Sequence, residues 1–159
     1  MTDQAATATA RQSVSVPLTP ERAFELFVDE FDSWWPKSSH TTAGDATTVV
    51  LEPRPEGRWG ELDSAGEYSA WGRVLAAERP SWILLAWQLD PDFKLDPDTT
   101  MQTEVEVTFA AEGEAGTRVT LEHRGFEVWG ERGAGMRDSV DAEGGWSELL
   151  GLYAEVAAR

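Results

Sequence analysis

Residues 103–124 read TEVEVTFAAEGEAGTRVTLEHR, and the architecture of the chain can be worked out from them. Apolar and polar residues alternate on both arms, a period-two pattern typical of strands with one buried face. Between the arms lies EGEAG, residues 112–116, whose glycines can take positive φ in a turn. We therefore predict a β-hairpin with one apolar face that another element must cover. His123 follows Val119 and Leu121 on that face.

Composition limits the classes of partner. The chain has 159 residues, 41% of them hydrophobic, so one folded domain with a real core is expected. The formal net charge is −16, and no run of lysine and arginine is present to neutralise phosphate. We therefore expect an acidic protein that binds no nucleic acid and no membrane.

Cysteine is absent and only two histidines are present. Disulfides, thiolate nucleophiles and cysteine-based zinc sites are thereby excluded, and we expect no metal site and no cofactor. The first ten residues show no signal-peptide pattern, and no stretch of about 18 apolar residues occurs. The expected location is cytoplasmic.

The chain opens with small polar residues, and we predict a disordered tail over residues 1–11 and a single domain over residues 12–159. Residues 12–18 alternate and predict a first strand. Thr19 as N-cap and Pro20 as first helical residue then predict a helix that ends near Asp32. It carries apolar residues at helical spacing, namely Phe24, Phe27, Val28 and Phe31.

Two adjacent tryptophans follow this helix. Pro36 should hold Trp35 in an extended conformation, and we expect one of Trp34 and Trp35 to pack inward and the other to lie near the rim. His40 lies in a polar loop, where a solvated side chain is the common case.

Four further strands are predicted over residues 47–52, 58–63, 67–78 and 81–89. The third has no clear phase, because Tyr68 and Val74 share one face while Trp71 shares the other. After the hairpin, residues 131–140 are weakly helical. A longer helix from Trp146 carries an apolar stripe. It comprises Trp146, Leu149, Leu150, Tyr153 and Ala157.

This order of elements predicts an α+β fold in which a curved antiparallel sheet wraps around a long C-terminal helix. One stripe of side chains cannot fill the whole concave face of a curved sheet. We therefore expect space between sheet and helix, and such spaces are common ligand sites.

In order and spacing the chain resembles the SRPBCC superfamily, the START-like or birch-pollen-allergen-type helix-grip fold. Within it the chain is most similar to the branch resembling the C-terminal domain of the activator of heat-shock-protein ATPase. The likeness spans about residues 13–158. Its segments are VSVPLTPERAFELF, FDSWWP, LEPRPEGRWGEL, WGRVLAAERPSWILLAWQL, TEVEVTF, VTLEHRGFE and GGWSELLGLYAEVA. The position after Trp59, often aromatic in this branch, is Gly60 here, which either widens the pocket locally or changes the twist.

The resemblance implies a ligand site lined by aromatic side chains, since it places five tryptophans around the cavity. These are Trp35, Trp59, Trp71, Trp87 and Trp146. Flat apolar indoles with one N–H donor suit an aromatic ligand. The predicted site also includes residues on the apolar faces of the hairpin and the terminal helix, namely Phe109, Leu121, His123, Leu149, Leu150 and Tyr153.

His123 has two interpretations: a hydrogen-bond donor or proton shuttle inside the cavity, and a structural histidine near a strand end. Glu61 and Asp141 are weaker candidates for acid–base chemistry, and solvated surface acids are the expected reading for both. Arg54 and Arg73 can meet an anionic ligand or simply lie along a strand edge.

Three functions follow. The first is a domain that binds a small hydrophobic or aromatic molecule without a cofactor. The second, implied by the resemblance, is a co-chaperone-like module that binds a chaperone or another protein. The third is an enzyme of the cyclase or hydrolase kind that uses His123, since relatives sharing the fold include polyketide cyclases. A monomer and a homodimer are both consistent with the sequence.

Overall fold

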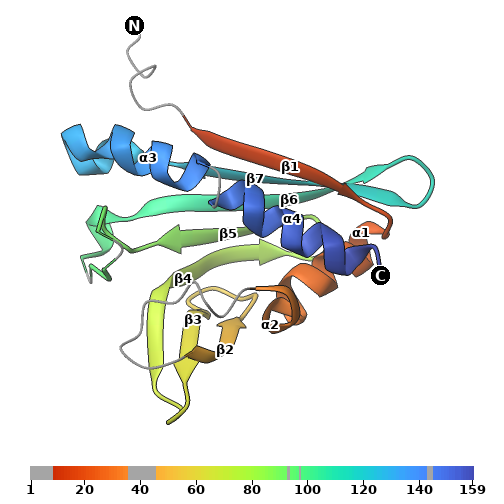
Figure 1. Ribbon diagram of the computed structural model, residues 1–159, viewed down its shortest axis with the longest axis horizontal. Coiled ribbons are helices and arrows are strands. Elements are labelled where there is room, and N and C mark those ends of the chain that lie inside the picture. Colours follow the sequence, from red (N-terminus) through yellow and green to blue (C-terminus); the bar gives the residue numbers. More distant parts are fainter. Residues whose placement is uncertain (1–8, 36–45, 93, 97, 143–144) are drawn as a thin grey trace, which may run out of the picture.

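A seven-stranded antiparallel sheet forms one layer of the molecule, and helices pack on one of its faces (Figure 1). The computed structural model describes residues 9–35, 46–92, 94–96, 98–142 and 145–159. The strands lie in the order β1-β7-β6-β5-β4-β3-β2. They are β1 (Ala10–Val16), β2 (Ala46–Leu51), β3 (Arg58–Asp63), β4 (Tyr68–Glu78), β5 (Trp82–Trp87), β6 (Thr103–Glu112) and β7 (Gly116–Arg124).

The predicted hairpin is confirmed as β6 and β7, paired from Glu104 and Arg124 to Glu112 and Gly116. Gly113 takes a φ of 69° in the turn, a conformation that favours glycine. From Thr103 to Phe109 and from Thr117 to Arg124, the inward residues are buried and the outward ones are polar. On the outer face Arg124 contacts three carboxylates at 2.8–3.3 Å, which keeps that face polar while the other packs.

β1 pairs with β7 along its whole length, so the first strand of the chain lies beside the last. It begins at Ala10, two residues before the predicted start. It ends at Val16, immediately before Pro17, which lacks the N–H that a ladder needs. The sheet is thereby extended beyond the hairpin.

The predicted N-terminal helix forms in three pieces: α1 (Pro20–Phe24), a π-helical turn (Glu25–Asp29) and α2 (Phe31–Trp34). The side chain of Thr19 accepts a hydrogen bond from the backbone N–H of Arg22 at 3.3 Å, as an N-cap does. The helical run ends two residues beyond the predicted Asp32. Trp35 is then extended, with a φ of −74° and a ψ of 131°.

The expectation that one of Trp34 and Trp35 lies at the rim is wrong, because both are buried. The two rings contact each other edge-on, with centroids 5.6 Å apart. Trp34 also packs on Phe27 and Tyr153, and Trp35 on Trp71. The backbone is helical at Trp34 and extended at Trp35, so both side chains reach the interior.

β4 carries two β-bulges, which explains its unclear phase. Trp59 pairs with Gly72 and Gly60 with Ala70, so Trp71 is an extra residue. A second shift between Val74 and Ala76 leaves Leu75 extra. Because each bulge moves the alternation by one residue, Trp71 and Val74 can both be buried.

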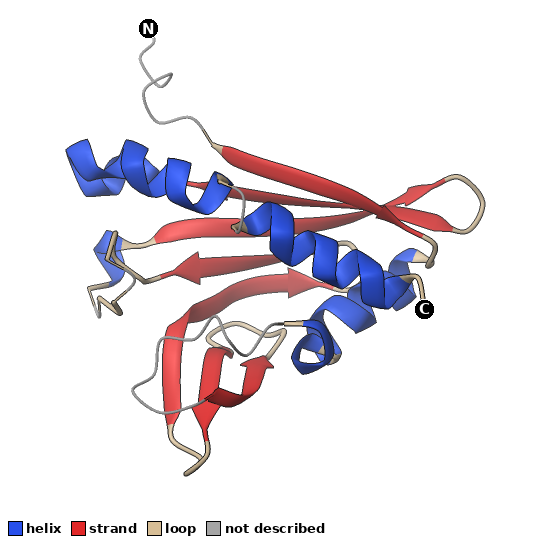
Figure 2. Ribbon diagram, viewed as in Figure 1, coloured by secondary structure: helices blue, strands red, loops and turns tan. Residues whose placement is uncertain are grey.

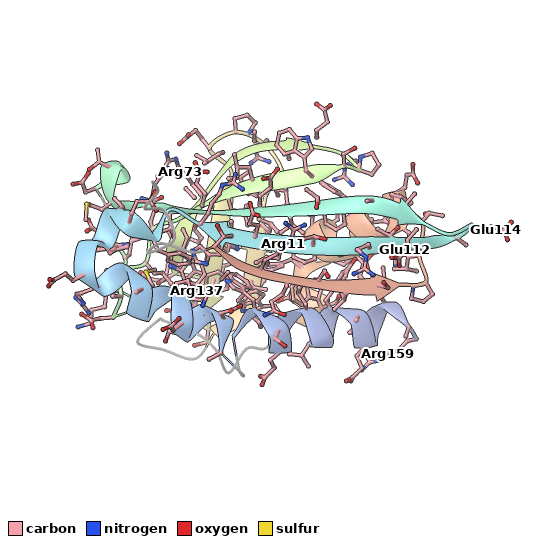
Figure 3. All side chains as sticks on the ribbon, turned by 90° about the horizontal axis from the view of Figure 1, so that it is seen from above. Arg11, Arg73, Glu112, Glu114, Arg137 and Arg159 are labelled. Atoms are coloured by element: carbon pink, nitrogen blue, oxygen red, sulfur yellow. The ribbon has the colours of Figure 1, made fainter. Side chains whose placement is uncertain are left out.

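The C-terminal part contains two 3-10 segments, η3 (Thr99–Met101) and η4 (Phe126–Arg132), and the helices α3 (Gly133–Asp141) and α4 (Trp146–Ala157). α4 runs across one face of the sheet (Figures 1 and 2). In the view from above, side chains fill the layer between the sheet and α4, while labelled charged residues such as Glu114 and Arg159 reach outward (Figure 3). The predicted α+β helix-grip architecture is confirmed. No described helix is long and apolar enough to cross a membrane.

Candidate functional site

The interior between sheet and helices contains two aromatic clusters, which touch where the rings of Trp34 and Trp35 lie 5.6 Å apart. The first, here called the phenyl cluster, lies where α1 packs on β6 and β7. Neighbouring rings contact edge-on or tilted, with centroids 4.8–5.7 Å apart. Its members are Phe24, Phe27, Trp34, Phe109 and Tyr153.

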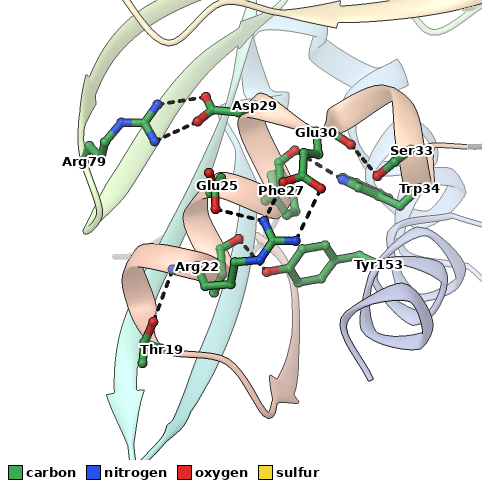
Figure 4. Close-up of polar contacts among 11 residues, drawn as sticks. Thr19, Arg22, Glu25, Phe27, Asp29, Glu30, Ser33, Trp34, Arg79 and Tyr153 are labelled. Carbon is green, nitrogen blue, oxygen red and sulfur yellow. Dashed lines mark hydrogen bonds and ion pairs between the residues drawn. The ribbon is translucent and has the colours of Figure 1, made fainter. Parts of the chain in front are cut away.

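Both polar side chains of the phenyl cluster have hydrogen-bond partners (Figure 4). The hydroxyl of Tyr153 donates to the carbonyl oxygen of Ala23 at 2.8 Å. The indole N–H of Trp34 donates to the carbonyl oxygen of Phe27 at 3.2 Å. Burial raises the pKa of the Tyr153 phenol, so it stays a neutral donor. This half of the interior is therefore a well-satisfied core.

The second cluster, here called the indole cluster, contains the five tryptophans predicted from the resemblance. Each ring contacts two others, so the five form a closed circuit. In order around it they are Trp35, Trp71, Trp59, Trp87 and Trp146, with centroids 5.0–6.4 Å apart. Trp59, Trp71 and Trp87 come from the sheet, whereas Trp35 and Trp146 come from the segments that cover it.

Gly72 makes part of this circuit possible. It lies on β4 in register with Trp59 of β3 and Trp87 of β5. A Cβ atom at this position would lie 1.8 Å from the carbonyl oxygen of Ala86 and 3.2 Å from the Trp59 ring. The missing side chain lets the two indoles meet across the strand between them.

His123 adjoins the indole cluster, with its ring 5.0 Å from that of Trp87 and 4.5 Å from that of Phe126. The indole N–H of Trp146 donates to Nδ1 at 3.0 Å, and Nε2 lies 2.7 Å from the hydroxyl oxygen of Thr103. Because Nδ1 accepts, the proton of the neutral ring is on Nε2 and points to Thr103. Burial lowers the pKa of His123 to about 3, so the ring is uncharged near neutral pH.

Three other indole N–H groups of the cluster have a different environment. Those of Trp35, Trp59 and Trp71 are buried, and no described residue accepts a hydrogen bond from them. Tryptophan has no acceptor of its own, so neighbouring indoles cannot satisfy one another. The indole cluster therefore has more donors than acceptors.

One cavity lined by described residues lies at the junction of the two clusters. It measures about 10 Å³, room for about one water molecule. In this part of the interior the rings themselves occupy most of the space that we expected between sheet and helix. The cavity is lined by Phe27, Phe31, Trp35, Leu51, Trp59, Leu85, Val105, Val107, Leu121 and Trp146.

The remaining predicted site residues fall in different places. Leu121 lines the small cavity, and Leu150 lies on the buried side of α4. Phe109 and Tyr153 belong to the phenyl cluster, away from the indole circuit. Leu149 is only partly buried and packs at the margin of the core.

Glu61 differs most from its expected surface position, since it is fully buried. It lies two residues after Trp59 on β3 and therefore shares the concave face. Asp141, in contrast, accepts a hydrogen bond from Gln12 at 2.9 Å and is partly exposed. For Glu61 the surface reading is wrong.

Neither candidate arginine reaches the interior. Arg54 is exposed beside Glu52. Arg73 lies on the face opposite Val74 and donates to Gln102 at 2.8 Å. His40 lies outside the described residues. Within the described ranges, no group of three or more histidine, aspartate or glutamate side chains could hold a metal ion.

Sequence reasoning missed two kinds of site residue. Phe27 and Phe31 line the cavity, and the signal that could have identified them is their helical spacing, which places them on one apolar face. Thr103 is hydrogen-bonded to His123, and this pairing depends on strand register, which alternation alone does not fix.

A curved antiparallel sheet closed by a C-terminal helix over an aromatic interior defines a domain of the SRPBCC helix-grip type. The chain belongs to the AHSA1 family, the activator of Hsp90 ATPase homolog 1-like proteins, whose model matches residues 17–156. No curated protein matches the chain.

Solved structures similar to the chain include two at about 30% identity. The anthrahydroquino-γ-pyrone synthase Txn09 is 30% identical, with a TM-score of 0.64 over 95% of this chain and 98% of that one. CalC, a self-sacrificing resistance protein from Micromonospora echinospora, is 31% identical, with a TM-score of 0.70 over 96% and 95%. An Hsp90 activator from Plasmodium falciparum shares the fold at 17% identity, a TM-score of 0.50 and 73% and 71% coverage.

Proposed function

We propose that this protein binds a small, flat, hydrophobic ring compound in the indole cluster, without a cofactor. The observation that carries the proposal is the closed circuit of five tryptophans from five separate elements of the fold. Stacked and edge-on indole contacts are the kind that fused-ring molecules make with proteins. The name of the relative Txn09, a synthase of an anthrahydroquino-γ-pyrone, adds support from a protein of similar sequence.

Binding at the cavity between the two clusters requires the circuit to open, because this cavity, among those lined by described residues, holds about 10 Å³. The circuit crosses from sheet to covering segments at two contacts, Trp35 with Trp71 at 5.0 Å and Trp87 with Trp146 at 5.6 Å. A flat molecule that inserts between the two sides replaces these ring contacts with its own. Association then follows an opening step, so its observed rate should level off at high ligand concentration.

In this proposal His123 positions the ring of Trp146 and does not act as an acid or base. Both ring nitrogens are already engaged, with Trp146 and with Thr103. Its lowered pKa makes it a poor base near neutral pH. These features support binding over acid–base catalysis by His123, and a turnover-dead but binding-competent His123→Ala variant would instead favour the enzyme.

The co-chaperone alternative is supported by the description of the family and tested by capture of the host's heat-shock ATPase. Binding of that ATPase by the wild-type protein, undiminished after indole-cluster substitutions, would favour a protein partner. If the same variants lose small-molecule binding, the result would favour the proposal that the protein binds a ring compound.

The direct experiment is a titration with 1-aminoanthracene, whose emission rises in apolar surroundings. We expect saturable one-site binding that Trp71→Ala weakens at least tenfold. Trp34→Phe, a change in the phenyl cluster, is the control and should leave affinity within twofold. Absence of saturable binding, or equal loss in both folded variants, would contradict the proposal.

A further inference from the structure

The unsatisfied N–H donors of the indole cluster restrict the chemistry of the ligand further than the apolar rings do. Trp35, Trp59 and Trp71 are 8%, 1% and 3% exposed, so their N–H groups have lost water. No described residue accepts from them. Trp71 contacts both of the others, at ring distances of 5.0 and 6.0 Å. Three unsatisfied donors thus lie within one group of touching rings.

A buried donor without an acceptor is unfavourable, and a phenyl ring would fill similar space without that penalty. Trp146 shows how the fold can solve the problem, since His123 supplies its acceptor. The other three indoles have no such partner in the described part of the chain. The arrangement is suited to an occupant that brings acceptors with it.

The charges around the indole cluster indicate whether the acceptor on the ligand is a charged carboxylate or a neutral carbonyl. Among the described residues, no lysine or arginine is buried. His123 is neutral, and Glu61, buried on the same face of the sheet, offers no positive charge. A carboxylate ligand would enter this interior without a counter-ion, which is strongly unfavourable. A carbonyl oxygen accepts hydrogen bonds and carries no net charge.

We propose that the ligand is a neutral fused-ring ketone, whose ring carbonyl oxygen accepts hydrogen bonds, through its two lone pairs, from two of the three indole N–H groups of Trp35, Trp59 and Trp71. This inference rests on the proposed function and narrows it. Ring hydrocarbons fit the walls but leave the donors unsatisfied, whereas fatty acids and aromatic carboxylates bring an unpaired charge.

Displacement of 1-aminoanthracene by three matched compounds tests this. Fluorenone and fluorene share one skeleton and differ by a carbonyl in place of a methylene, and fluorene-9-carboxylate adds the charge. We expect fluorenone to compete at least tenfold better than either of the others. In at least one of Trp71→Phe and Trp59→Phe that preference should fall at least threefold, whereas in the control Trp34→Phe it should be unchanged.

Indole N–H resonances of ¹⁵N-labelled wild-type protein give a readout that does not depend on variants folding. Fluorenone should move two of the Trp35, Trp59 and Trp71 resonances downfield. Those of Trp34 and Trp146, whose donors are already engaged, should move far less. Equal competition by fluorene and fluorenone without these shifts would overturn the ketone inference while 1-aminoanthracene binding keeps the proposed function. Failure of all four compounds to bind would overturn both.

Discussion

The two aromatic clusters share one interior but differ in how their polar atoms are treated. In the phenyl cluster, Trp34 and Tyr153 each donate to a backbone carbonyl of the N-terminal helical segment. In the indole cluster, Trp59 and Trp71 are equally buried and have no acceptor among the described residues. Burial is therefore similar in the two halves, and hydrogen bonding is what separates them.

This difference indicates that the phenyl cluster stabilises the fold, whereas the indole cluster is the part that opens. Close packing with satisfied donors is what a stable core requires. Large apolar rings with unsatisfied donors stabilise less than their area implies, since part of the burial energy is offset by lost hydrogen bonds to water. Such a region is expected to open more easily than the rest of the core. The predictions below test whether the two halves behave differently.

The largest effect is expected in the phenyl cluster. Phe27 contacts the rings of Trp34, Phe109 and Tyr153, so Phe27→Ala would leave a cavity where three rings meet. We expect a loss of about 3–5 kcal/mol in the free energy of unfolding, measured by urea denaturation. A loss below about 1 kcal/mol would mean that this half is not closely packed.

Gly72→Ala tests the crossing point of the indole circuit. The new Cβ would collide with the carbonyl oxygen of Ala86 and press on the Trp59 ring. We expect a loss of about 2–3 kcal/mol by the same measurement. The control is Gly151→Ala in α4, where no atom lies within 4 Å and a gain of about 0.5–1 kcal/mol is expected. Equal effects of the two substitutions would contradict the close approach.

His123 makes stability at the indole end depend on pH. Its pKa is about 3 in the folded protein and 6.5 when unperturbed, so below pH 6.5 the unfolded chain binds a proton that the folded one does not. Its contribution is complete above pH 6.5 and is lost as pH falls towards 3. At about 1.4 kcal/mol per pH unit, the wild type should lose about 2 kcal/mol more than His123→Gln between pH 6.5 and pH 5. Parallel stability profiles would show that His123 is protonated in the folded state.

The smallest expected effect on stability is the difference between two tryptophan-to-phenylalanine substitutions, one in each cluster. Trp34→Phe removes a hydrogen bond to Phe27 and leaves that carbonyl oxygen without its donor. Trp71→Phe removes a donor that has no described acceptor. Both variants lose the same ring area, so this loss cancels in the comparison. We expect Trp34→Phe to lower the free energy of unfolding by about 1 kcal/mol more than Trp71→Phe does. A lower urea midpoint for Trp71→Phe than for Trp34→Phe would contradict the difference in hydrogen bonding between the two clusters.

Most of the fold could be predicted because it depends on local patterns. Alternation located the β6–β7 hairpin, the Thr19-Pro20 pair marked the helix start, and apolar spacing identified α4. The errors have local physical causes as well. Two bulges in β4 break the alternation that reveals a buried face, and an extended Trp35 lets adjacent tryptophans both turn inward.

The site was less predictable than the fold. The five tryptophans that the resemblance named as ligand residues form one group of touching rings, and their role in binding stays a prediction. Their circuit depends on pairings such as Trp59 with Gly72 across strands. The burial of Glu61 and the bond between Thr103 and His123 also depend on the packing of distant elements. The volume left between sheet and helix follows from side-chain packing, which periodicity does not describe.

Hydrogen exchange of the indole N–H protons in the wild-type protein tests the central claim most directly. If the indole cluster is the part of the interior that opens, the Trp59 and Trp71 protons should exchange at least tenfold faster than that of Trp34. Saturating fluorenone should then slow them towards the Trp34 rate. Exchange equally slow in both clusters, with no effect of the compound, would show a uniformly closed core and contradict the account.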